Sequence, residues 1–254
     1  MNGTLFSLQN KNIIVTGASS GIGKQCAITC NQMGANVILI ALEEDKLNDT
    51  IRLLPGGNNL SYALDITKYD EIDGIISDAV SKIGKISGFI HSAGIEMTLP
   101  LNVLKAENYS KIYAVNVISA FEISKRISHR KNCDESGASF VFIASIMSDF
   151  GQAGKIGYCS SKGALVAGAR AMALELVSKK IRVNCISPGM VTTEMSQKLL
   201  ESLSVEAQNE IFRMHPMGIG QPLDVANGCV FLLSEAAKWI TGINLYIDGG
   251  YGAK

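Results

Sequence analysis

Short apolar runs alternate with helical stretches along the whole chain. The runs that read as buried strands are residues 12–16, 36–41, 60–64, 86–91, 139–144, 181–186 and 243–247. The spacing of apolar residues predicts helices over 21–33, 43–54, 69–83, 103–127, 158–178, 197–212 (interrupted) and 222–233. Continuous apolar strands that alternate with helices form a parallel sheet covered on both faces. The predicted fold is therefore α/β, a Rossmann-type doubly wound parallel sheet of about seven strands.

Composition sets limits on the class of protein. The chain has 254 residues, 47% of them hydrophobic, and no linker or repeat interrupts the alternation, so we expect one domain over residues 1–254. Its 23 basic and 23 acidic side chains give a net charge of zero, whereas a nucleic-acid surface needs a basic excess. No nucleic-acid partner is therefore expected.

Cysteine usage and hydropathy bear on metals, membranes and compartment. The six cysteines form no Cys-x-x-Cys pair and there are only three histidines, so we expect no metal site and reduced, buried thiols. No signal peptide is visible in residues 1–10, and no apolar run approaches the roughly 18 residues that a membrane span needs. These features predict a cytoplasmic protein without a membrane partner.

Three glycines follow the first predicted strand and open the first predicted helix. Gly17, Gly21 and Gly23 are spaced G-x-x-x-G-x-G. Glycine permits a tight turn and close approach of the backbone to a phosphate, and a helix N-terminus favours negative charge. The alternative is a merely flexible turn, but the position after the first strand favours a dinucleotide site.

A tyrosine and a lysine four residues apart stand near the middle of the chain. Tyr158 and Lys162 share one helix face, and Ser145 lies thirteen residues before the tyrosine. A nearby ammonium is expected to lower the pKa of the phenol from about 10 and to make proton exchange with an alcohol or carbonyl feasible. Taken alone, each residue also fits a structural role, such as a helix-face pair or a helix cap.

These motifs, in this order, resemble the short-chain dehydrogenase/reductase family, in particular its 3-oxoacyl-carrier-protein reductase-like and its sugar or polyol dehydrogenase-like members. The matches run along nearly the whole chain and comprise T-G-x-x-x-G-I-G at 16–23, H-S-A-G at 91–94 in place of N-N-A-G, Asn116, Ser145, Tyr158, Lys162, P-G-x-x-x-T at 188–193, and T-G followed by D-G-G at 241–250.

The resemblance implies a hydride transfer between a nicotinamide cofactor, NAD(H) or NADP(H), and a carbonyl or secondary alcohol. It implies that Tyr158 is the general acid or base, that Lys162 lowers its pKa and binds the nicotinamide ribose, that Ser145 donates to the substrate oxygen, and that Asn116 orders a water near Lys162. The residues it implies for cofactor binding are Gly17, Ser19, Ser20, Gly21, Ile22, Gly23, Asp65, Ile66, Ala93, Gly94, Tyr158, Lys162, Pro188, Gly189, Val191 and Thr193. His91, which replaces an asparagine of the family pattern, is assigned no catalytic role.

Cofactor preference stays open in the sequence. An acidic residue at the end of the second strand binds the ribose hydroxyls of NAD, and a basic residue nearby binds the 2′-phosphate of NADP. Here the second predicted strand ends at Ala41, and Leu42 and Glu43 come next, so neither the acidic residue for NAD nor the basic residue for NADP stands clearly in place.

The substrate end is expected to be formed by segments that follow strand ends, at about 96–101, 146–154 and 190–214, the last acting as a substrate-covering segment. Methionines in these segments give an adaptable apolar lining. The segments contain no arginine cluster, which favours a neutral keto or hydroxy substrate, although Lys155 and Arg213 leave an anionic one open. The resemblance also implies a homotetramer, or a homodimer. Two alternatives are a dinucleotide-sensing or scaffold protein without chemistry, and a sugar-nucleotide epimerase or dehydratase.

Overall fold

The computed structural model describes residues 5–201 and 203–253. Within these residues one sheet holds seven strands, all parallel, in the order β3-β2-β1-β4-β5-β6-β7. The strands are β1 (Asn12–Thr16), β2 (Asn36–Ala41), β3 (Leu60–Ala63), β4 (Gly88–His91), β5 (Ala138–Ile143), β6 (Ile181–Pro188) and β7 (Asn244–Ile247). The predicted fold class is confirmed. The strand order reverses at β1, which pairs with β2 on one side and β4 on the other, so a crevice is expected at the carboxyl ends of these strands.

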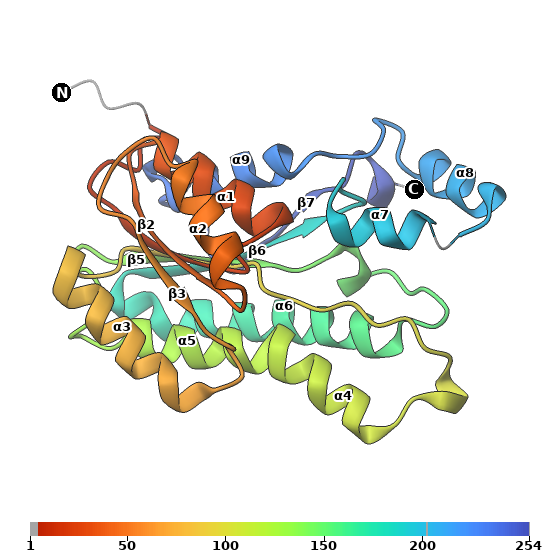
Figure 1. The fold of residues 1–254 in the computed structure, drawn as a ribbon, viewed down its shortest axis with the longest axis horizontal. Coiled ribbons are helices and arrows are strands. Elements are labelled where there is room, and N and C mark those ends of the chain that lie inside the picture. Colours follow the sequence, from red (N-terminus) through yellow and green to blue (C-terminus); the bar gives the residue numbers. More distant parts are fainter. Residues whose placement is uncertain (1–4, 202, 254) are drawn as a thin grey trace.

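Helices cover both faces of the sheet (Figure 1). One layer contains α1 (Gly21–Gln32), α2 (Glu44–Arg52) and α9 (Pro222–Leu233), and the other contains α3 (Tyr69–Ile83), α4 (Ala106–Tyr113), α5 (Ser119–Ile127) and α6 (Ile156–Leu176). Each layer has its own fully buried core, which includes Phe89 and Phe140 on the α6 side and Val15 and Leu39 on the α1 side. Because the inner strands are covered on both faces, their residues are apolar in succession, which explains the continuous runs in the sequence, whereas the edge strands β3 and β7 are only partly buried.

Two further helices, α7 (Glu194–Glu201) and α8 (Val205–Met214), lie beyond the carboxyl ends of the strands (Figure 1). The chain leaves the sheet after β6 and returns to it at Gly220, whose amide donates to Met190 at 3.0 Å and whose carbonyl accepts from Thr192 at 2.9 Å. The two ends of this excursion therefore lie side by side. Within the described residues, no helix is both long and apolar enough to cross a bilayer.

The predicted helix over 103–127 is not continuous. It consists of a 3-10 turn (Leu101–Val103), α4, a π-helical turn (Ala114–Ile118) and α5. The π-helical turn contains Asn116, whose amide is drawn to the backbone of Ile95. The periodicity of apolar residues does not predict a π-helical turn, because the chain stays helical through the turn.

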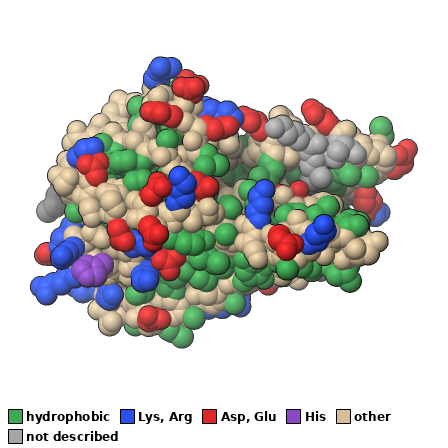
Figure 2. Space-filling view, turned by 60° about the horizontal axis from the view of Figure 1, so that its bottom comes forward, with side chains coloured by type: hydrophobic (Ala, Val, Ile, Leu, Met, Phe, Trp, Pro, Cys, Tyr) green, Lys and Arg blue, Asp and Glu red, His purple; other side chains and the backbone are tan. Residues whose placement is uncertain are grey.

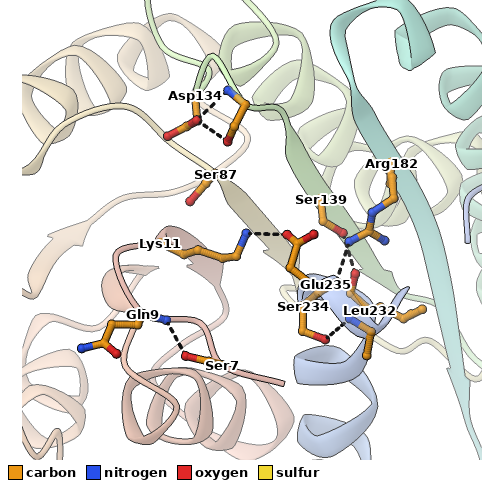
Figure 3. A network of polar contacts seen from close by, with 12 residues as sticks. Ser7, Gln9, Lys11, Ser87, Asp134, Ser139, Arg182, Leu232, Ser234 and Glu235 are labelled. Carbon is orange, nitrogen blue, oxygen red and sulfur yellow. Dashed lines mark hydrogen bonds and ion pairs between the residues drawn. The ribbon is translucent and has the colours of Figure 1, made fainter. Parts of the chain in front are cut away.

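A polar network lies at the amino-terminal ends of the strands, at the other end of the sheet from the carboxyl ends (Figure 3). The hydroxyl of Ser139 donates to the carbonyl of Leu232 at 2.8 Å, and Arg182 donates to the carbonyl of Ser234 at 3.3 Å. Lys11 forms an ion pair with Glu235 at 3.5 Å. These contacts fasten the starts of β1, β5 and β6 to the C-terminal end of α9 and satisfy its last carbonyls.

Candidate active site

A cavity of about 990 Å³ opens at the carboxyl ends of the strands. It extends from the glycine loop and the end of β2, past β4, to the first turns of α6 and the α7–α8 excursion. All the residues implied for cofactor binding line it: Gly17, Ser19, Ser20, Gly21, Ile22, Gly23, Asp65, Ile66, Ala93, Gly94, Tyr158, Lys162, Pro188, Gly189, Val191 and Thr193. Ser145 lines it as well, whereas Asn116 lies behind its wall.

The glycine loop has the backbone that glycine alone adopts easily. Gly17 and Gly21 have φ values of +68° and +51°. A Cβ on Gly17 would lie 2.9 Å from Cα of Ala93, and a Cβ on Gly23 would lie 2.2 Å from the carbonyl oxygen of Gly17. The absence of side chains thus lets β1, the next loop and α1 pack closely, and it leaves the N-terminus of α1 facing the cavity. A bare backbone at a helix N-terminus fits the pyrophosphate of a dinucleotide.

The end of β2 offers little charge to this cavity. Ala41 is buried, and Leu42 is 69% exposed. Glu43 forms an ion pair with Lys46 at 2.7 Å, so its carboxylate is already partnered. No uncompensated charge among these residues selects for or against a 2′-phosphate.

Asp65 follows β3 and is held by a local turn. Its Oδ1 accepts from the amide of Thr67 at 2.9 Å and from the hydroxyl of Thr67 at 2.7 Å. These two bonds, the amide first, lower the pKa of the carboxyl below its usual value. Asp65 is therefore an ionised, oriented carboxylate in the cavity wall.

Tyr158 and Lys162 project from α6 toward the end of β5. The Nζ of Lys162 donates to the main-chain oxygen of Ile143 at 2.7 Å and lies 5.8 Å from the centroid of the Tyr158 ring. Burial lowers the pKa of Lys162 to about 8. Lys162 is 5% exposed, so its ammonium is costly to keep charged.

The pKa of Tyr158 differs from the expectation. Burial raises it to about 12, the negative charge of Glu96 adds to the rise, and a hydrogen bond from Ser145 opposes it. The expected lowering of the Tyr158 pKa by Lys162 is therefore not found, because loss of hydration around the ring disfavours the phenolate. A phenol with this pKa is protonated at neutral pH and is suited to donate a proton.

Asn116 uses its whole amide inside the protein. Its Oδ1 accepts from the amide of Ile95 at 2.8 Å, and its Nδ2 donates to the carbonyl of Ile95 at 3.0 Å and to the hydroxyl of Ser161 at 3.1 Å. Asn116 therefore connects the loop after β4 to α6, just behind Gly94 and Lys162.

His91 ends β4 and is fully buried. Its Nδ1 lies 3.0 Å from the hydroxyl of Thr16, which also accepts from the amide of Ala93 at 3.3 Å. Burial lowers the pKa of His91 to about 3, so the ring is neutral at physiological pH. This residue joins β1 to β4 beneath the cavity and does not line it.

Two polar contacts in the cavity wall have no local signal in the sequence. Glu96 and Lys155 form an ion pair at 2.7 Å, although they are 59 positions apart. His215 bridges two segments: its Nε2 accepts from the amide of Met190 at 2.9 Å, and its Nδ1 donates to the carbonyl of Ile211 at 2.8 Å. From the sequence, Lys155 was expected only as a positive charge near the substrate end, and His215 was not predicted to belong to the site.

A family model described as Enoyl-(Acyl carrier protein) reductase matches residues 17–252. The 3-oxoacyl-(acyl-carrier-protein) reductase of Thermotoga maritima is 31% identical over 246 residues, which are 96% of this chain and 98% of that protein. The NAD-dependent glycerol dehydrogenase of Listeria innocua is 32% identical, over 98% of this chain and 96% of that protein.

Solved structures agree with these matches. A 7α-hydroxysteroid dehydrogenase complexed with NADH and 7-oxo glycochenodeoxycholic acid superposes with a TM-score of 0.91 at 31% identity, covering 98% of this chain and 97% of the other. The likeness in sequence and in fold extends over nearly the full length of each protein. The chain therefore belongs to the short-chain dehydrogenase/reductase family of oxidoreductases.

Proposed function

We propose that the protein transfers a hydride between NAD(P)(H) and a neutral substrate at a carbonyl or secondary alcohol carbon. The observation that carries this proposal is that Ser145, Tyr158 and Lys162 line the same cavity as the glycine loop. A bound nicotinamide would supply or accept the hydride, and the protein orients the substrate and moves the proton.

In the direction of reduction, Tyr158 donates its proton to the substrate oxygen. Ser145 donates a hydrogen bond to the same oxygen, where negative charge develops. Lys162 stabilises the phenolate that is left. Because the Asn116 amide is fully engaged with protein groups, its part in a proton relay is to fix the π-helical turn, whose main chain would hold the water.

The proposed substrate is small and uncharged at the reacting end. The relatives act, by their names, on a 3-oxoacyl group, on glycerol and on a hydroxysteroid. Their shared chemistry is a carbonyl or secondary alcohol, and we carry over only that. The α7–α8 excursion, at about 190–214, is proposed to cover the substrate, since Met190, Met195 and Met214 line the cavity.

We further propose a homotetramer or homodimer that assembles through the helical stretch at 103–127, α6 and β7, in a cytoplasmic setting. Ile118 is 42% exposed and Leu174 is 78% exposed. Figure 2 shows hydrophobic side chains gathered on the face that carries these lower helices. Some of the small residues of α6 serve packing within the chain, since a Cβ on Gly168 would lie 2.2 Å from the ring of Phe121. Light scattering with and without Leu174→Lys tests the assembly.

A carbonyl panel with NADH and NADPH tests the function, with Tyr158→Phe as the matched variant. We expect the variant to lose more than nine tenths of the turnover while its cofactor dissociation constant stays within a few-fold of wild type, because the phenol acts on the substrate proton. A variant that keeps more than one tenth of the activity at saturating substrate would remove Tyr158 from the mechanism. Cofactor binding without turnover of any carbonyl would favour the sensor alternative.

A further inference from the structure

The ion pair between Glu96 and Lys155 lies inside the cavity, beside the tyrosine. Lys155 is the N-cap residue of α6, three positions before Tyr158, and its side chain is 7% exposed. Its Nζ lies 5.8 Å from the centroid of the Tyr158 ring. Glu96 follows β4 in the loop that Asn116 fixes, and its side chain is 22% exposed. Both side chains line the cavity.

A buried ion pair is weak evidence for stability. Removing two charges from water costs several kcal/mol, which the attraction between them seldom exceeds. The loop that follows β4 and the loop that follows β5 are also joined without this ion pair, since the amide of Leu99 donates to the carbonyl of Gly154 at 2.7 Å. A pair that is not needed to join the loops, in the wall of a reaction cavity, is better explained by what it offers to a ligand.

The hydrogen-bonding capacity of the pair is only partly used. Oε1 of Glu96 accepts from Nζ of Lys155 and, at 2.6 Å, from the hydroxyl of Thr98. Among the described residues, Oε2 of Glu96 receives no hydrogen bond and Nζ of Lys155 donates no second one. The cavity is therefore presented with a free acceptor and a free donor held side by side.

This combination selects one kind of substituent. A hydroxyl both donates and accepts, so it can satisfy Oε2 and Nζ together. A carboxylate would be repelled by Glu96, an ammonium would be repelled by Lys155, and a methylene group would leave both charges unsolvated. On the basis of the proposed function, we infer that Glu96 and Lys155 bind a second hydroxyl next to the reacting carbon, so that the substrate is a vicinal diol or the corresponding α-hydroxy ketone.

Three small ketones that share one carbonyl test this inference. Hydroxyacetone carries the hydroxyl, butan-2-one replaces that hydroxyl with a methyl group, and pyruvate replaces the whole hydroxymethyl group with a carboxylate. Wild type is expected to show a kcat/KM for hydroxyacetone at least tenfold above that for each of the others. A site built to bind a hydroxyl rejects analogues without it, because its own polar groups are then left unpaired.

Two variants distinguish recognition of the substrate hydroxyl by the ion pair from a role of the ion pair in holding the loops together. Lys155→Met should reduce the preference for hydroxyacetone over butan-2-one at least tenfold. Glu96→Gln leaves the ammonium without its counter-ion, so the ratio of pyruvate to hydroxyacetone should rise at least tenfold. Loss of loop support alone would lower the values for all three ketones alike. Lys85→Met, which removes an ion pair of 3.0 Å with Glu135 away from the cavity, should change no ratio.

Equilibrium binding gives a second readout that needs no turnover. The dissociation constants of propane-1,2-diol and butan-2-ol are measured by ligand-observed NMR, with the protein alone and with NADH. Tighter binding of the diol in wild type, at least tenfold and lost in Lys155→Met, supports the inference even if none of the three ketones is reduced. The proposed function is rejected separately, by cofactor binding without turnover of any carbonyl in the wider panel. Turnover with less than threefold preference, or a diol affinity that both variants retain, overturns the inference and leaves the proposed function intact.

Discussion

The ammonium of Lys162 donates to the main-chain oxygen of Ile143 across 2.7 Å, and this contact fastens the reacting face of α6 to the end of β5. Within the described residues no carboxylate forms an ion pair with Lys162, so only its hydrogen bonding offsets the lost hydration. The site thus holds a positive charge in a poorly hydrated position, where its proposed action on the phenol and on the nicotinamide ribose would be little screened.

The first prediction concerns the pH dependence of reduction. The ammonium form of Lys162 is the form expected to stabilise the phenolate, and its pKa is about 8. The value of kcat/KM for reduction should therefore be constant below about pH 8 and decline as the pH rises through this pKa. Initial rates between pH 6 and 10 measure this, and a profile that stays flat to pH 10 would contradict it.

The second prediction is a gain of stability in Lys162→Met. The lysine pKa falls from 10.5 unfolded to about 8 folded, so the buried charge costs ~3 kcal/mol at pH 7. After the lost hydrogen bond is subtracted, the variant should be more stable by ~2 kcal/mol. Between pH 8 and 10.5 the unfolded chain binds more protons than the folded one, so wild type gains stability with rising pH and the difference should close. Urea unfolding at pH 7 and pH 10 measures this, and an inactive variant that is no more stable would oppose it.

The third prediction concerns the glycine loop. Gly21→Val introduces a β-branched side chain at a φ of +51° and at the mouth of the phosphate site, so affinity for NADH and NADPH should fall at least a hundredfold. Gly74→Val, in α3 where a Cβ would meet nothing within 4 Å, is the control. Calorimetry measures both. Retained affinity in a folded Gly21→Val protein would make the loop an ordinary turn.

The fourth prediction concerns cofactor choice. Because Leu42 is exposed and Glu43 is paired with Lys46, wild type should discriminate between NAD and NADP by less than about 100-fold, the worth of one charged contact. Ala41→Asp should shift preference toward NAD, and Leu42→Arg should shift it toward NADP. The ratio of kcat/KM for NAD to kcat/KM for NADP, in wild type and in both variants, measures this preference. Wild-type discrimination above a thousandfold would mean that another residue reads the ribose.

The fifth prediction concerns His215. Its ring joins Met190 to Ile211 through two hydrogen bonds, so His215→Leu should release α8 from the strand end. Amide exchange of residues 190–214 should quicken at least tenfold, and KM should rise more than kcat falls. His129→Leu, at an exposed position, is the control. Unchanged exchange in residues 190–214 would show that the covering segment is held by other contacts.

The sequence predicted the sheet correctly because buried strands have local signals, whereas the roles of the reacting residues stay a prediction. The apolar runs mark strands, the inner ones buried on both faces and the edge strands β3 and β7 partly buried, and the spacing of Tyr158 and Lys162 places them on one face of α6. The glycines after β1 also give a local signal, and the structure places them in the wall of the same cavity, while their binding of a cofactor stays a prediction.

The remaining features depend on contacts between distant residues. Glu96 meets Lys155 only because the loops after β4 and β5 lie side by side, and His215 meets Met190 only because the excursion returns to the sheet. The π-helical turn forms around an amide that bonds 21 positions away. The direction of the Tyr158 pKa shift was also misjudged, because a helix-face pair shows the neighbouring charge but not the loss of water around the ring.

The excursion between Thr192 and Gly220 has a practical consequence. Its ends pair with each other, α8 contributes no buried residue to the described fold, and the glycine loop, β5 and α6 lie outside it. Such an insert can be exchanged as a cassette, because closing a new loop across adjacent ends costs little entropy and disturbs neither core. Libraries that vary residues 194–219 on an unchanged scaffold would therefore be a direct way to redirect this catalyst to new alcohols.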